Sequence, residues 1–95
     1  MNDKKLFQQK KQAQLDEWRA KVEILKAKAS GTSADIQLEL NHKIEQLDTK
    51  LEEGKRKLAD LEDAGEEAWE SVVDGVENAW DSMKNAVGDA VKKFT

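Results

Sequence analysis

Glu39 and His42 are the one pair in this chain whose types and spacing match a metal-binding motif. A Glu-x-x-His pair places both side chains on one face of a helix, and di-iron helical bundles use such pairs as ligands. However, His42 projects away from the apolar stripe of its own helix, so a metal there would need ligands from another copy of the chain. We therefore expect a solvated His42, no metal site and no cofactor, with a ferritin-like di-iron oligomer as the alternative.

The sequence offers no other starting point for catalysis. It has no cysteine and no tyrosine, a single histidine, and no glycine-rich phosphate loop or nucleophile elbow. Acidic pairs such as Glu66 and Glu70 are typical of the solvated face of a helix. We predict that the protein is not an enzyme.

Charge is distributed unevenly along the chain. Residues 1–28 carry eight basic and four acidic groups, whereas residues 60–95 carry three basic and ten acidic groups. The N-terminal lysines spread around their helix without interleaved aromatic residues, and the whole chain has a net charge of −4, so we expect no nucleic-acid partner. Segments of opposite charge attract when they pack side by side, which can select the orientation of helices and the choice of partner.

Long helices are the elements that must position these residues. Charged and apolar residues each make up 38% of the 95 residues, and proline is absent, which is typical of long helices and coiled coils. The N-terminus lacks the apolar stretch of a signal peptide, and no run approaches the ~18 apolar residues of a membrane span. We therefore expect a cytoplasmic protein.

An apolar residue recurs every eleven positions in the second part of the chain. The series is Ile36, Leu47, Leu58, Trp69, Trp80 and Val91. Eleven residues make three turns at about 3.67 residues per turn, close to the helical 3.6, so the stripe runs nearly parallel to the axis of one helix. The C-terminal third also repeats as sequence, with AGEEAWESVVD (64–74), GVENAWDSMKN (75–85) and AVGDAVKKFT (86–95).

These patterns predict an all-α, elongated helical hairpin with a helix over 3–29, a turn over 30–33 and a helix over 34–94. Gly31 can end the first helix, and Thr32 with Asp35 resembles a capping box that starts the second. Short links join antiparallel neighbours, which predicts a coiled-coil hairpin. The side chains expected to hold it are Leu15, Trp18, Val22, Leu25, Ile36, Leu40, Ile44 and Leu47.

The segment 63–66 is a candidate hinge, because Gly65 lies between acidic residues. A turn there would give a three-helix bundle in which the third helix runs parallel to the first. Acidic residues 66–89 would then lie beside basic residues 4–28. The unbroken phase of the apolar stripe favours a continuous helix instead.

A continuous second helix would leave its C-terminal stripe without a partner in the same chain. An apolar patch of that size marks an interaction surface, so we predict a homo-oligomer, with another protein as a further candidate partner. The predicted interface residues are Trp69, Val72, Val76, Trp80, Met83, Val87 and Phe94. The alternative is an amphipathic helix on a membrane surface, but its acidic polar face would be repelled by anionic headgroups, so we expect no membrane partner.

Three segments carry a resemblance to a known family. These are AQLDEWRAKVEILKAKAS, KLEEGKRKLADLEDA and the doubled AW-[ED]-S. Over about residues 13–94 the chain resembles a family of small bacterial coiled-coil stress-response proteins, and the 11-mers are more weakly similar to late-embryogenesis-abundant repeats. The resemblance implies a bacterial, cytoplasmic, stress-associated helical protein without known enzymatic activity, and it supplies no catalytic residues. We therefore expect a non-enzymatic structural or interaction protein that acts through self-association and protein contacts.

Overall fold

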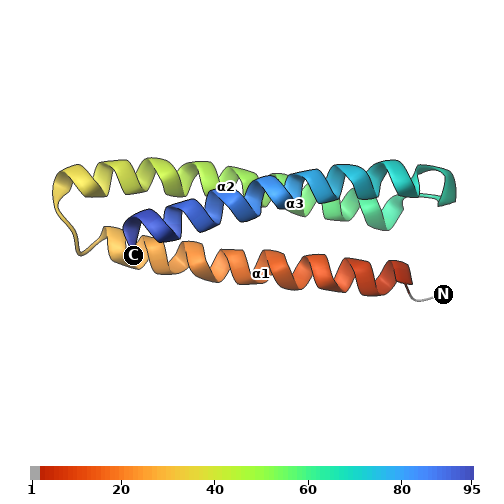
Figure 1. Cartoon of the computed structure of the whole chain (residues 1–95), viewed down its shortest axis with the longest axis horizontal. Coiled ribbons are helices and arrows are strands. Elements are labelled where there is room, and N and C mark those ends of the chain that lie inside the picture. Colours follow the sequence, from red (N-terminus) through yellow and green to blue (C-terminus); the bar gives the residue numbers. More distant parts are fainter. Residues whose placement is uncertain (1–2) are drawn as a thin grey trace.

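Three helices make up the computed structural model, which describes residues 3–95. They are α1 (Asp3–Ala29), α2 (Ala34–Asp63) and α3 (Glu66–Phe94), and the described part of the chain contains no strand. The helices lie side by side in a rod with dimensions of 51 × 18 × 17 Å (Figure 1). The first helix and the turn after it lie where the sequence predicts them, but Ser33 rather than Thr32 precedes the first turn of α2.

The structure departs from the predicted hairpin at Ala64 and Gly65. The sequence favours one uninterrupted helix over 34–94, whereas these two residues are extended, with φ/ψ of −72°/131° and −77°/174°. The chain therefore reverses, and α3 returns along α2 and parallel to α1 (Figure 1). The alternative three-helix arrangement is thus the one the structure has. Reversal removes the apolar stripe of α3 from water at the cost of a break of only two residues in the helix.

One core runs along the rod where the apolar stripes of the three helices meet. Residues three or four positions apart share a face of each helix, which is why the stripes are continuous. The buried apolar residues are Leu15, Trp18, Val22, Leu25, Ala29, Leu40, Ile44, Leu47, Leu51, Leu61, Val76, Trp80, Met83, Val87 and Ala90.

The antiparallel pair α1 and α2 contributes most of this core. Seven of the eight predicted hairpin residues are buried in it, and Ile36 differs, with 46% of its surface exposed. Ile36 lies in the first turn of α2, at the end of the rod, where α1 has already ended. Ile36 lines an open pocket there with Lys28 of α1 and Phe94 of α3, so its side chain is only partly covered.

Gly54 on α2 brings α3 close to the α2 backbone. A Cβ at this position would lie 2.6 Å from Cε of Met83 and 3.3 Å from both Leu15 and Trp80. The 2.6 Å contact is shorter than real Cβ atoms make, so the flexible end of Met83 would have to move to admit a side chain here, and the two 3.3 Å contacts are tighter than usual. The glycine therefore sets how deeply Met83 and Trp80 pack between α1 and α2.

Candidate functional site

The best-defined recognition feature is the groove between α1 and α2 that holds α3, here called the α3 groove. Of the predicted interface residues, Val76, Trp80, Met83 and Val87 are buried in it. The other three, Trp69, Val72 and Phe94, are partly buried against the same core. The expectation that this stripe has no partner within its own chain is therefore wrong, because the reversal at residues 64–65 supplies one.

Trp80 is the central anchor of α3 in the groove. Only 2% of its surface is exposed, and its Nε1–H donates a hydrogen bond to the main-chain oxygen of Lys11 at 3.2 Å. Its ring lies 6.2 Å from that of Trp18, centroid to centroid. A buried indole needs such an acceptor, so the apolar body and the polar edge of Trp80 are both satisfied.

Charged and aromatic side chains link the N-terminal half of α1 to α3. Lys11 is 7% exposed, and its ammonium group forms an ion pair with Glu77 and lies 5.2 Å from the ring centroid of Phe7. The ammonium group of Lys4 lies 4.9 Å from the ring centroid of Trp69, and that ring packs edge-on against Phe7. These contacts place basic α1 beside acidic α3, as the charge distribution of a three-helix bundle predicts.

The Lys11–Glu77 pair is not predicted from the sequence. The available signal was a lysine on the apolar stripe of α1, but its partner lies 66 positions away in the chain. Which acidic residue meets Lys11 depends on the register of α3 against α1. That register follows from the turn at residues 64–65, which the sequence did not favour.

Two polar contacts between exposed side chains accompany the register of α3 along α2. Lys50 Nζ donates to Ser82 Oγ at 3.2 Å, and Lys93 forms an ion pair with Glu39. The Glu39 carboxylate, half of the Glu-x-x-His pair, therefore binds a lysine, while His42 is exposed. Within residues 3–95 the structure brings together no group of three His, Asp or Glu side chains that could hold a metal.

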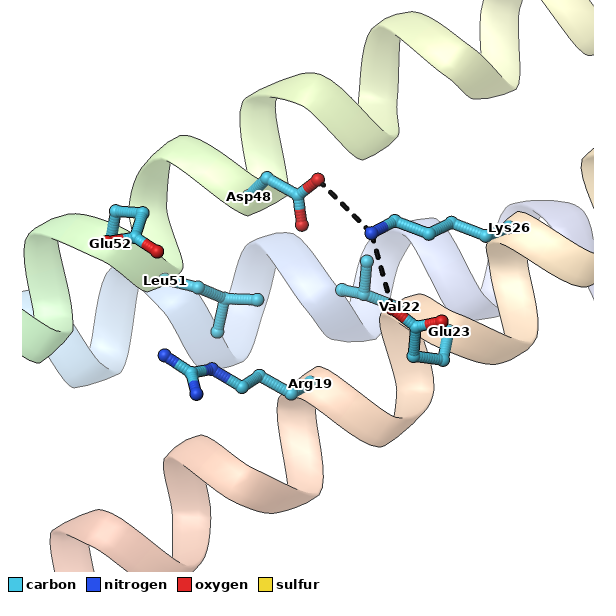
Figure 2. A pocket seen from close by; sticks show the side chains of 7 residues that line it. All are labelled: Arg19, Val22, Glu23, Lys26, Asp48, Leu51 and Glu52. Carbon is cyan, nitrogen blue, oxygen red and sulfur yellow. Dashed lines mark hydrogen bonds and ion pairs between the residues drawn. The ribbon is translucent and has the colours of Figure 1, made fainter.

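A second groove runs along the opposite seam, between α1 and α2 (Figure 2). Its volume is about 370 Å³, and its lining residues are Arg19, Val22, Glu23, Lys26, Asp48, Leu51 and Glu52. Lys26 Nζ lies 3.3 Å from Glu23 and 3.5 Å from Asp48. The hydrogen bond that Lys26 Nζ donates to the Glu23 carboxylate raises the pKa of Lys26, burial opposes this shift, and the charge of Asp48 adds to it. The Lys26–Asp48 ion pair therefore links α1 to α2 across this seam.

The outer surface is mostly charged, but four large apolar side chains are exposed within residues 3–95. Leu6 and Ile24 lie on α1, and Ile36 and Leu38 lie near the start of α2. No helix within residues 3–95 is long and apolar enough to cross a membrane.

Comparisons of the chain with protein-family models, with curated proteins and with solved structures found no match.

Proposed function

We propose that this protein is a non-enzymatic helical interaction protein that acts through self-association and through contacts with other proteins. The observation that supports this most directly is the α3 groove, which binds an amphipathic acidic helix along its length. Helix-in-groove binding is a recurring mode of protein recognition. The resemblance to bacterial stress-response proteins adds a stress-associated, cytoplasmic role to the proposal.

The natural partner for this groove is a second copy of the chain. Every copy carries both the groove and a helix whose apolar anchors and charges fit it. The predicted interface residues, from Trp69 to Phe94, then make the same contacts between copies that they make within one. The elongated hairpin with a continuous helix over 34–94 is the conformation we propose for this associated state.

Sedimentation equilibrium over a wide range of protein concentration tests the proposal. We expect a discrete dimer whose fraction rises with concentration. Association competes with the closed monomer, in which α3 packs against α1 and α2 of its own chain. Leu38→Ser is a matched control, since it removes an exposed apolar side chain outside the α3 groove and should leave the dimer constant unchanged. A chain that stays monomeric throughout would contradict self-association, and its flotation with lipid vesicles would then favour the membrane-surface alternative.

A further inference from the structure

We infer that two copies of this chain exchange α3, with Ala64 and Gly65 becoming helical so that residues 34–94 form one helix in each copy. The inference rests on the proposed self-association and names its surface and its partner. The surface is the α3 groove of one copy, and the occupant is α3 of another copy. Four features of the closed monomer carry the inference.

The link between α2 and α3 is short and imposes no turn of its own. It consists of Ala64 and Gly65, both in extended conformations that any residue adopts, and neither has a positive φ. A Cβ at Gly65 would meet nothing within 4 Å, so the closed form does not require glycine there. Short links between packed elements favour exchange, because the link can straighten without losing contacts of its own.

The end of α2 at the link is poorly stabilised, whereas Glu66 and Glu67 complement the dipole at the start of α3. Gly65 offers no side chain to cap α3, and the last turn of α2 contains no basic residue. Instead, Glu62 and Asp63 lie at the negative end of the α2 dipole, which is unfavourable. A continuous helix would give the free main-chain groups their i to i−4 partners and would place both carboxylates in a helix interior.

The pairing of residues between α2 and α3 would stay the same if α3 were exchanged between two chains. The contacts Lys50–Ser82 and Glu39–Lys93 are both centred on residue 66, next to the link. Two long antiparallel helices that cross at this residue would remake each contact between chains in the same register. The exchanged dimer therefore retains the groove contacts of two closed monomers.

In the exchanged dimer, the two long helices would also meet through apolar faces where they cross near residue 66. In a continuous helix Leu61, Gly65 and Ala68 share one face, because they are spaced by four and three residues. This face continues the apolar stripe of α2, so the two long helices can pack against each other through it where they cross. A residue that the closed monomer leaves in open space thus lies at the centre of the exchanged dimer.

Two substitutions at residue 65 should shift the equilibrium between the closed monomer and the exchanged dimer in opposite directions. Gly65→Pro fits the closed form, since the φ of −77° suits proline and the ψ of 131° at Ala64 suits the residue before it. In a helix interior the same proline should weaken dimerisation on the order of 100-fold per link. Gly65→Ala should strengthen it about fivefold per link, because alanine has the higher helix propensity. Gly88→Ala is the control, as it makes the same chemical change inside α3 in both states, where a Cβ meets nothing within 4 Å.

Cross-linking shows directly which chain supplies α3. The protein contains no cysteine, so Lys50→Cys and Ser82→Cys can be introduced in separate chains. Refolded together and treated with a short bis-maleimide, the two variants should give a covalent heterodimer. The same mixture with Gly65→Pro in both chains should not. The double variant with Gly65→Pro should cross-link within one chain, which confirms that the reagent spans the site.

The outcomes distinguish this inference from the self-association on which it rests. Opposite shifts for the alanine and proline variants, together with the heterodimer, would support exchange. If Gly65→Pro dimerised like the wild type, and the two cysteine variants that keep Gly65 gave no heterodimer, exchange would be wrong. Association would then use another face, such as the exposed Leu6 and Ile24. If no variant dimerised, including Gly65→Ala, self-association itself would be overturned.

Discussion

Gly54 is the residue at which helix propensity and packing oppose each other. Alanine would stabilise the helix by about 1 kcal/mol, but its Cβ would press on Met83, Leu15 and Trp80. The end of Met83 is flexible, whereas the Trp80 ring is held by a hydrogen bond, so the clash cannot be relieved fully. We expect Gly54→Ala to lower the free energy of unfolding by about 1–2 kcal/mol, measured by urea denaturation.

The exposed Gly88 provides the comparison. Gly88→Ala makes the same chemical change in a helix interior with open space around it, so we expect a gain of about 0.5–1 kcal/mol. Equal effects at the two positions would show that α3 does not pack against Gly54 as described.

Lys11 and Glu77 form the one ion pair of the described chain in which a side chain is almost fully buried. Glu77→Gln should cost about 1 kcal/mol, because it leaves the ammonium group without its counter-charge while Glu77 itself is half exposed. Lys11→Met should be neutral or stabilising, since it replaces a buried charge by an apolar side chain of similar volume and keeps the main-chain acceptor of Trp80. Thermal unfolding of both variants checks this, and a large loss of stability in Lys11→Met would contradict it.

At the scale of elements, the sequence predicts the helical segments and their apolar faces, but it does not favour the chain reversal between α2 and α3. The end of α1 carries a local signal in Gly31, and the predicted boundary at residue 29 matches the structure. The link at 64–65 carries no comparable signal, because Gly65 lies in phase with the apolar stripe. Neither Gly31 nor Gly65 has a positive φ, so backbone conformation does not distinguish the two glycines. The reversal is decided by burial of α3 against α1 and α2. That is a tertiary effect, which local spacing does not report.

The start of α2 provides a prediction at this scale. Ser33 occupies the N-cap position, but its hydroxyl makes no capping hydrogen bond, and only its main-chain oxygen enters the helix. We therefore expect Ser33→Ala to change the free energy of unfolding by less than about 0.5 kcal/mol, below the usual ~1 kcal/mol for loss of a cap. A loss of the usual size in chemical denaturation would mean that the hydroxyl does cap α2.

At the scale of the whole molecule, the charge distribution agrees with the observed packing. Basic α1 and acidic α3 run parallel and in contact, and the Lys11–Glu77 pair lies between them. Attraction between exposed charges is screened when the Debye length falls from about 30 Å at 0.01 M salt to about 3 Å at 1 M. We expect sodium chloride over this range to lower the melting temperature at neutral pH. An unchanged or higher value would show that like-charge repulsion within the acidic C-terminal segment dominates instead.

The parallel course of α1 and α3 has a mechanical consequence. The start of α1 and the end of α3 lie at opposite ends of the 51 Å rod (Figure 1). Tension applied through these two ends acts along the long axis, so the helices must slide past one another instead of peeling apart turn by turn. Contacts along the whole core then resist together, and forced unfolding is governed by the rate at which they break. The rod should therefore resist tension along its long axis better than tension that pulls the helices apart from one end.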